Sequence, residues 1–318
     1  MPGCSKCPAA AVVHLRYAGT SLCREHFLEF FARRAKQEVA KQGRLPEGTL
    51  AVALSGGKDS ASALHFLHGL ASGNPRIRLV AVTVDEGIAG YRDAAMESCR
   101  ALTARLGVEW RTVRTRDLAG YTIDDYAEGT AGPKGETLPG TARPACGPCG
   151  VFRREGMNRL AQEAGATAIV TGHNLDDMAQ TILMNHLKGD VARLARLAPH
   201  DSAQDGLVPR LMPFRTIPEK EVLLYAVLNG IEFHGHPGAG GEGLAECPYA
   251  ARSHRFALRH VLVGLEETTP GTRHALVRGQ ERLKPILQAA MPAGPMAVCA
   301  ECGQPTSGDV CAACRWRA

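Results

Sequence analysis

The chain has 318 residues, of which 45% are hydrophobic and 22% are charged. This balance is that of a folded globular protein and excludes an intrinsically disordered one, and the length allows a large α/β core with smaller appended modules. The net charge of +5, from 37 basic and 32 acidic residues, permits nucleic-acid binding without requiring it.

The chain shows no sign of membrane insertion or secretion. No apolar run approaches the roughly 18 residues of a membrane-spanning helix, and the N-terminus lacks the pattern of a secretory signal. We therefore expect a cytoplasmic protein without membrane contact. Its eleven cysteines would stay reduced there, so they indicate metal ligands or reactive thiols before they indicate disulfides.

The first 26 residues contain two pairs of metal-binding side chains. Cys4 is paired with Cys7, and Cys23 with His26, with two residues inside each pair. Each pair fits one tight turn, and three thiolates with one imidazole suit a tetrahedral structural zinc ion. Apolar residues at helical spacing from Phe27 onwards predict a helix that docks this module onto the next domain.

A predicted strand at 49–54 passes into a helix near Lys58 through the turn Ser-Gly-Gly-Lys-Asp-Ser. Glycines allow successive N–H groups to converge on an anion, and the helix start adds a partial positive charge. The serines add hydroxyl donors, the lysine adds a cation, and the aspartate suits a magnesium ion or a bracing cap. The spacing is not that of a Walker A loop and instead resembles the PP-loop of ATP pyrophosphatases. The predicted ATP-binding residues here are Ser55, Gly56, Gly57, Lys58, Asp59 and Ser60.

From residue 49 onwards, predicted strands and helices alternate, which is typical of a parallel sheet covered by helices on both faces. The further strands are predicted at 77–84, 108–113 and 167–171. Asp85 ends the first of these, and His173 follows the last, so both lie at the sheet edge where open α/β folds bind nucleotides. Asp85 could equally be a turn former. The Asp176–Asp177 pair at the next helix start could bind magnesium or act as a helix cap.

The middle of the chain carries three cysteines with no assigned partner. Cys146 and Cys149 lie on a glycine-rich turn before a helix expected to start at Val151, and this helix start with its arginines should favour thiolates. The preceding stretch, 115–145, lacks periodicity and reads as an insertion. Cys247 follows a glycine-rich loop at 235–243 and precedes a basic helix whose Arg255 and Arg259 suit an RNA backbone or an ordinary solvated face.

Two further CxxC pairs close the chain after a proline-containing linker at 292–295. Eight residues separate the pairs, and the turns contain glycine, which predicts a four-cysteine zinc ribbon. The predicted domains are a zinc module at 1–42, an α/β domain at 43–291 and this ribbon at 292–318. The ribbon ligands are Cys299, Cys302, Cys311 and Cys314.

Once the zinc ligands are assigned and Cys99 is set aside as a buried thiol, Cys146, Cys149 and Cys247 remain. Three thiolates fall one short of a closed zinc site or a fully ligated four-iron cluster, which would leave one iron without a protein ligand. The competing hypothesis is a persulfide relay, in which one cysteine carries sulfur and a second resolves it through a disulfide. A relay needs only two thiols, which favours the cluster.

The ordered motifs CxxC, CxxH, SGGKDS, CGxCG, GHNxDD, ECPY and the terminal CxxC pairs resemble those of the TtuA-type tRNA 2-thiouridine synthetases and their eukaryotic and archaeal wobble-uridine relatives. The resemblance spans nearly the whole chain. It implies that ATP activates the carbon-2 oxygen of a tRNA uridine as an adenylate and that sulfur then displaces AMP. It also implies ATP, Mg²⁺, two Zn²⁺ ions and a four-iron, four-sulfur cluster as cofactors, with a ubiquitin-like sulfur carrier or sulfide as donor.

Carried onto this sequence, the resemblance places the cluster on the three central cysteines and ATP on the loop and His173. A catalytic acid or base falls on Asp177, and a basic residue of the family falls on Arg153 or Arg154. The predicted catalytic residues are Cys146, Cys149, Cys247, Asp177 and Lys58. We also predict a homodimer, because the terminal zinc modules could pack across a two-fold axis.

Two other functions compete with tRNA thiolation. An ATP pyrophosphatase that adenylates another carbonyl, as amidotransferases do, would have no use for three central thiols. A zinc-ribbon RNA- or protein-binding module without catalysis would show no tRNA-dependent exchange between ATP and pyrophosphate.

Overall fold

The computed structural model describes residues 3–43, 45–138, 140, 142–198, 206–235, 246–291 and 296–317. Apart from Gly235, the predicted glycine-rich loop at 235–243 lies outside these residues, and so does the predicted linker at 292–295.

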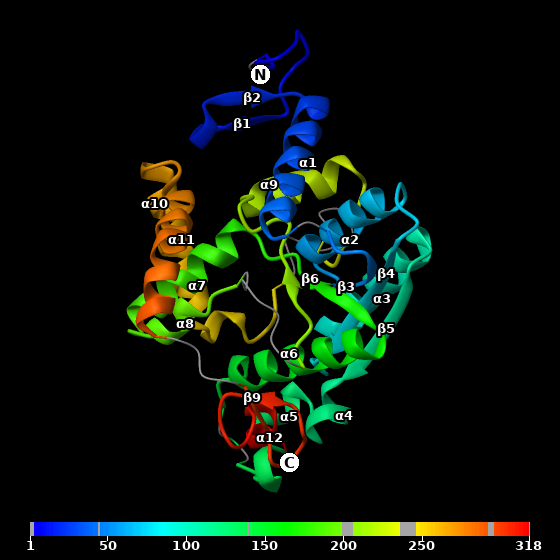
Figure 1. Cartoon of the computed structure of the whole chain (residues 1–318), viewed down its shortest axis with the longest axis vertical. Helices are drawn as coiled ribbons and strands as arrows, with labels where there is room; N and C mark the ends of the chain where they lie inside the picture. Colours follow the sequence, from blue (N-terminus) through cyan, green and yellow to red (C-terminus); the bar gives the residue numbers. More distant parts are fainter. Residues whose placement is uncertain are drawn as a thin grey trace.

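The centre of the molecule is a five-stranded sheet in which every neighbouring pair is parallel, in the order β5-β4-β3-β6-β7 (Figure 1). This confirms the predicted sheet, and each predicted strand agrees with the structure to within one residue at either end. The short edge strand β7 was not predicted. The order of strands reverses between β3 and β6, which places a ligand-binding crevice at their carboxyl ends. The strands are β3 (Gly48–Ala53), β4 (Ile77–Asp85), β5 (Glu109–Arg114), β6 (Ala166–Val170) and β7 (Arg210–Leu211).

Alternate residues of the central strand face opposite layers of helices. Leu50 and Val52 are buried in a cluster with side chains from four helices, while Ala51 packs with Leu160 on the other face. This period of two is the geometry of a strand covered on both sides. The helices of the first layer are α1 (Arg24–Lys41), α2 (Lys58–Ala71), α3 (Tyr91–Leu106) and α9 (Glu219–Leu228), and α6 (Cys146–Glu163) covers the second face.

Helix α1 joins the N-terminal module to the sheet, as its apolar spacing predicts. Phe27 and Phe31 are fully buried, and the Phe31 ring stacks on Tyr225 of α9 with centroids 4.3 Å apart. Both phenylalanines belong to the same hydrophobic cluster as Leu50 of the central strand. The predicted domain boundaries near residues 42 and 292 stay predictions.

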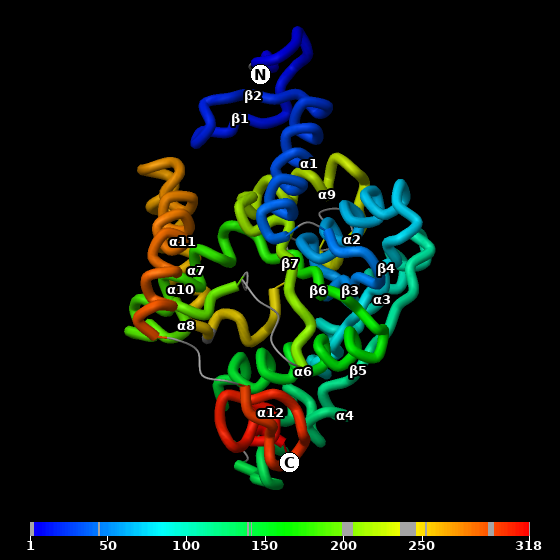
Figure 2. Tube along the Cα trace, viewed as in Figure 1, coloured from blue at the N-terminus to red at the C-terminus, as the bar shows by residue number. Residues whose placement is uncertain are grey.

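A second group of helices lies beside the sheet and carries one wall of the crevice (Figure 2). Leu175 and Met178 of α7 pack in one hydrophobic cluster with Leu262 of α10 and Val277 of α11. The start of α7 is thereby fixed from the side away from the sheet. These helices are α7 (Leu175–Leu187), α8 (Val191–Ala195), α10 (His254–Thr268) and α11 (Thr272–Ala290).

The stretch at 115–145 is more ordered than its sequence indicates. It contains two short helices, α4 (Thr115–Ala119) and α5 (Ile123–Glu128), and the second begins with a capping box between Thr122 and Asp125. Tyr121 is buried between them and packs against Phe152 of α6. These helices are too short to show a period in the sequence, so the expectation of an aperiodic insertion was wrong in this part.

The terminal modules lie at opposite ends of the long axis of the molecule (Figure 1). The C-terminal module packs on α6, since Cys314 and Trp316 share a hydrophobic cluster with Phe152. Among the described residues, no helix combines the length and the apolar character needed to cross a membrane. The modules contain β1 (Val13–Leu15) and β2 (Thr20–Leu22) at one end, and β8 (Ala297–Val298), β9 (Pro305–Thr306) and α12 (Ala312–Trp316) at the other.

Candidate ATP and sulfur site

The predicted phosphate loop leaves β3 at the crevice and is held against α3. Gly56 has φ of +86°, and a Cβ atom there would lie 2.4 Å from the carbonyl oxygen of Ala95, so only glycine fits. The Ser60 hydroxyl accepts a hydrogen bond from the Ser55 amide at 3.1 Å and lies 3.0 Å from the Gly57 carbonyl oxygen, to which it donates. The loop is therefore closed on itself at the start of α2.

Lys58 is buried between two carboxylates. Its Nζ atom lies 2.9 Å from Asp59 and 2.7 Å from Glu219 at the start of α9. Burial lowers the pKa of Lys58, but these two carboxylates outweigh it and raise the pKa to about 12. Burial raises the pKa of Asp59 to about 6, with Lys58 opposing and the charge of Asp177 adding to the shift. Several carboxylates that lie close together repel one another when they are ionised. A divalent cation bound between them would offset this repulsion.

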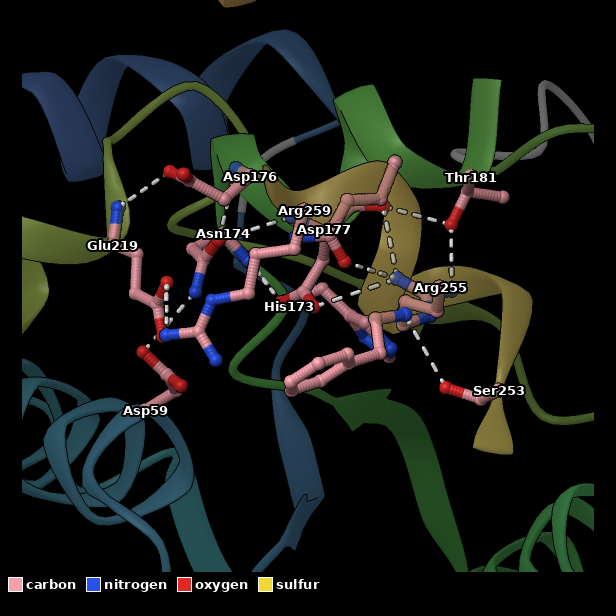
Figure 3. Close-up of polar contacts among 12 residues, drawn as sticks. Asp59, His173, Asn174, Asp176, Asp177, Thr181, Glu219, Ser253, Arg255 and Arg259 are labelled. Atoms are coloured by element: carbon pink, nitrogen blue, oxygen red, sulfur yellow. Dashed lines mark hydrogen bonds and ion pairs between the residues drawn. The ribbon is translucent and has the colours of Figure 1, made fainter. Parts of the chain in front are cut away.

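The loop and the start of α7 meet where the strand order reverses. The Asn174 side chain donates to Asp59 at 3.2 Å and caps α7 by accepting from the amides of Asp176 and Asp177 (Figure 3). A Cβ atom on Gly172 would lie 2.5 Å from the Asp59 carbonyl oxygen, so the close approach of the two segments requires glycine there.

The adjacent aspartates of α7 have different surroundings. Asp176 is buried, forms an ion pair with Arg273 of α11 and accepts from the Glu219 amide at 2.8 Å. Asp177 is half-buried and faces the crevice, where its nearest cation is Arg255 at 3.7 Å. The Asp176 carboxylate is thus engaged by Arg273 and by the Glu219 amide, and Asp177 remains accessible to a ligand.

Two basic residues of α10 contact side chains and backbone around the crevice. Arg255 donates to the Asp177 carbonyl oxygen at 3.3 Å and to Thr181 at 2.9 Å, and Arg259 pairs with Glu246 at 2.8 Å and with Glu219 at 3.6 Å (Figure 3). These contacts place both arginines at the crevice, and contact between this face and an RNA backbone stays a prediction.

Two other predicted nucleotide ligands lie at the same sheet edge. His173 is exposed, and its Nδ1 atom lies 2.8 Å from the Thr171 hydroxyl, which fixes the ring. Asp85 accepts a hydrogen bond from the Gly87 amide at 2.9 Å, which is the turn-forming role considered for it. A contact between Asp85 and a nucleotide stays a prediction.

One predicted ATP residue, Asp59, and one predicted sulfur residue, Cys247, line a common cleft of about 260 Å³. Asp59, Asp177, Tyr91, Cys247 and Arg259 are among the residues that line it. The sequence places Asp59 and Cys247 almost two hundred residues apart, and the fold brings them to the same cavity.

The three central cysteines come from two segments, and Cys247 is the one that lines the cleft. Cys149 and Cys247 both pack against one hydrophobic cluster that includes Ile88 and Ile123, and Cys146 is exposed. Tyr249 donates to Asp124 of α5 at 2.7 Å, so the segment that carries Cys247 is tied to the insertion. The helix that carries the other two thiols begins at Cys146 rather than at Val151, which corrects the predicted boundary by more than one turn.

The three thiols suit a cluster better than a single ion. Among the described residues, the groups whose ligand atoms all lie within 4.8 Å of one another are the two terminal sets, and the central cysteines are not one of them. Cysteines that bind different irons of one cluster are spaced more widely than ligands of one ion. Three sulfur donors without a fourth protein ligand therefore fit a cluster with one open iron position.

Burial works against the thiolates expected at the start of α6. It raises the pKa of Cys149 to about 12 although Arg153 opposes the shift, and it also raises the pKa of Cys247, for which no such expectation was made. Binding of a metal would replace the protons of these two thiols.

The structure distinguishes the two candidate basic residues of α6. Arg153 lies one helical turn after Cys149, on the same face, and its Nε atom is 3.1 Å from Glu86. The guanidinium of Arg154 lies over Gly150 of its own helix. Arg153 thus has an acidic partner near the cysteines, and the assignment of the family's basic role to it stays a prediction. Sequence reasoning missed this partner, Glu86, although it directly follows Asp85.

Both terminal sets have the geometry of metal sites. In the N-terminal set, the Nδ1 atom of His26 lies 3.5 Å from the Cys4 sulfur and 3.3 Å from the Cys23 sulfur. In the C-terminal set, the sulfurs of Cys302 and Cys311 are 3.7 Å apart. All four donors of each set fall within 4.8 Å of one another, which suits one tetrahedral ion per set.

The two sets should differ in what their loss does. Structural zinc contributes folding free energy, so Cys4→Ser and Cys314→Ser should each lower the melting temperature by roughly 5 °C or more. Only Cys314→Ser should also lower metal retention by the central cysteines, because the C-terminal module packs on α6 beside Phe152. Calorimetry and metal analysis of both variants measure this, and equal retention of iron in the two would contradict it.

Comparison with known proteins agrees with this geometry. A family model described as a PP-loop domain matches residues 28–238, and a model of the 2-thiouridine synthetase TtuA N-terminal LIM domain matches residues 4–28. The tRNA 2-thiolation protein NcsA of Haloferax volcanii is 37% identical, with 98% of this chain and 97% of that protein covered. The cytoplasmic tRNA 2-thiolation protein 1 of Bos taurus is 39% identical, with 98% and 86% covered. The solved U34-tRNA thiolase NcsA of Methanococcus maripaludis, with its [4Fe-4S] cluster, is 30% identical, covers 99% of this chain and 95% of its own, and superposes with a TM-score of 0.80.

The sheet order, the loop at the end of β3 and the match over residues 28–238 define a PP-loop protein of the ATP-using class. The similarity extends beyond that domain to nearly the full length of the relatives. The chain belongs to the PP-loop family of tRNA 2-thiolation sulfurtransferases.

Proposed function

We propose that this protein is an ATP-dependent tRNA-uridine 2-sulfurtransferase that adenylates the carbon-2 oxygen of the uridine and then lets sulfur displace AMP. The observation that carries this proposal is the shared cleft, in which Asp59 of the phosphate loop and Cys247 line the same cavity. A reaction that activates an oxygen and then replaces it with sulfur needs both groups within reach of one atom.

ATP would lie with its phosphates at the start of α2. The amides of Gly56 and Gly57, the hydroxyls of Ser55 and Ser60 and the charge of Lys58 would neutralise the leaving pyrophosphate. Asp85 and His173, at the neighbouring strand ends, would complete the nucleotide site.

Magnesium would lie between the carboxylates that face the cleft. Asp59 and Asp177 are accessible from it, whereas Asp176 is occupied by Arg273. Oxygen ligands suit Mg²⁺, which would offset the negative charge of the phosphates. Asp177 would be the acid or base that moves the proton of the uridine as its oxygen is adenylated.

Cys146, Cys149 and Cys247 would hold a four-iron cluster beside the activated carbon. When bound, the cluster would supply an iron position without a protein ligand, at which a sulfur nucleophile can be kept deprotonated. Arg153 would stabilise negative charge beside the cysteines, and the two terminal sets would each hold a structural zinc ion.

The substrate would be tRNA, and the sulfur would come from a ubiquitin-like carrier or from sulfide. We expect a cytoplasmic homodimer. We expect position 34 as the modified uridine, because the solved thiolase that superposes with a TM-score of 0.80 is named for that position.

Nucleoside mass spectrometry with position mapping tests this function in tRNA from cells with and without the protein. We expect 2-thiouridine at the mapped position only when the protein is present. Unchanged 2-thiouridine in its absence would contradict the proposal. A purified protein that releases AMP with tRNA but gives no thiolated product would favour another adenylating reaction.

A further inference from the structure

We infer that Glu86 is a positioning residue that holds the ATP loop and the cysteine site in one fixed arrangement through two arginines, Arg92 and Arg153. The inference rests on the proposed function and adds to it a residue that connects the ATP loop with the cysteine site.

Glu86 is a buried carboxylate shared by two guanidinium groups. Only 5% of the residue is exposed, one carboxylate oxygen lies 2.7 Å from Arg92 Nε, and the other lies 3.1 Å from Arg153 Nε. Its carbonyl oxygen accepts from the Ile123 amide at 2.9 Å, so the backbone is fixed as well. A buried carboxylate with a cation on each oxygen can set the position of both cations.

Arg92 connects Glu86 to the ATP loop. Arg92 of α3 is 4% exposed and donates to the Ser55 carbonyl oxygen at 2.9 Å and to the Val84 carbonyl oxygen at 3.1 Å. Gly56, the next residue of the loop, is in close contact with Ala95 of the same helix. The first turn of α3 therefore sets the backbone of the loop, and Glu86 orients the arginine that makes this contact.

Arg153 connects Glu86 to the cysteine site. The Arg153 side chain is 48% exposed, so packing alone does not fix it, and it forms an ion pair with Glu86. Arg153 lies one helical turn after Cys149 on the same face of α6, so its charge lies beside the cysteine site. Without Glu86, Arg153 and Arg92 would be neighbouring cations with no anion between them, and the exposed one would move away.

Glu86→Gln tests the arrangement because it keeps the shape and removes the charge. Glu38→Gln is the matched control, since Glu38 is 1% exposed and its carboxylate pairs with Arg215 at 2.9 Å, away from the cleft. Binding of a non-hydrolysable ATP analogue tests the contact between Arg92 and the ATP loop. The thiolation rate and, separately, the iron per chain after anaerobic reconstitution test the effect of Arg153 on the cysteine site.

We expect Glu86→Gln to weaken binding of the analogue and to lower thiolation and iron retention, each by roughly tenfold or more. Glu38→Gln should lower the melting temperature comparably and leave all three within about twofold. A Glu86→Gln variant that differs from the Glu38→Gln variant in none of these would overturn the inference.

Variants of the half-exposed Arg153 keep the test decisive if Glu86→Gln does not fold. Arg153→Gln removes the attraction to Glu86, and Arg153→Glu replaces it with repulsion, so thiolation and iron retention should fall in that order. Analogue affinity should stay within about twofold in both, because Arg92 keeps its partner. Wild-type thiolation and iron in both variants would overturn the inference. Failure of the unchanged protein to form AMP or thiolated tRNA would instead contradict the proposed function.

Discussion

Lys58→Ala is expected to lower tRNA-dependent AMP formation by roughly 100-fold or more, because a preorganised cation at the leaving pyrophosphate acts in the transition state. Lys58 is 9% exposed and its Nζ atom sits 2.7 Å from Glu219 and 2.9 Å from Asp59, so it is held at the loop before ATP arrives. Release of AMP from labelled ATP in the presence of tRNA measures the effect.

Binding of tRNA should stay close to that of the unchanged protein, because Lys58 is enclosed by the loop and α9. Lys220→Ala is a suitable control, since Lys220 lies two residues into α9 and is exposed. It removes the same charge from the rim of the crevice and should leave AMP formation nearly unchanged. Undiminished AMP release by Lys58→Ala would show that the loop is not the ATP site.

The parallel sheet and the loop were predictable because their signals are local. Three of the four predicted strands, β3, β4 and β6, contain runs of buried residues next to helical patterns, and each of the four agrees with the structure to within one residue. Strand β7 is only Arg210–Leu211, a pair that has no period, so its register depends on β6. The short helices α4 and α5 depend likewise on tertiary contacts such as those of Tyr121.

The partners of the site residues were not predictable because they come from distant parts of the chain. Lys58 and Glu219 are 161 residues apart, and nothing in either segment indicates that they pair. Arg255 was expected on a basic face, and its contact with Thr181 of α7 could not be foreseen, because it depends on how α10 packs there through Leu262. Glu86 has no motif of its own, and only the positions of α3 and α6 make it a bridge.

The division of labour between Asp176 and Asp177 shows what the structure adds to a motif. The sequence gives two adjacent carboxylates that could each cap a helix or bind a metal. Both aspartates line the cleft, but Arg273, almost one hundred residues later, forms an ion pair with the buried Asp176, whereas Asp177 is half-buried and its ion pair with Arg255 is longer, at 3.7 Å. The choice between them therefore depends on α11, which no local pattern connects to this site.

Cys149→Ala is expected to lose iron and thiolation together while tRNA-dependent AMP formation continues. Anaerobic reconstitution of the unchanged protein should give about four irons per chain, with zinc counted separately, and exposure to air should destroy its thiolation activity. Cys146→Ala and Cys247→Ala should behave in the same way, because all three thiols serve one cluster. ATP chemistry should survive, since it belongs to the loop at 55–60, which is a different element.

Cys99→Ala is the matched control for this experiment. Cys99 is fully buried in α3, its thiol has a pKa raised to about 11 by burial, and it lies outside the three sets of ligands. Its removal should therefore leave iron content and thiolation within about twofold. A persulfide relay predicts the opposite for the central set, namely an active enzyme without iron and a disulfide between two of its cysteines. Full thiolation by protein in which metal analysis detects no iron would refute the cluster and establish the relay as the better account of these three thiols.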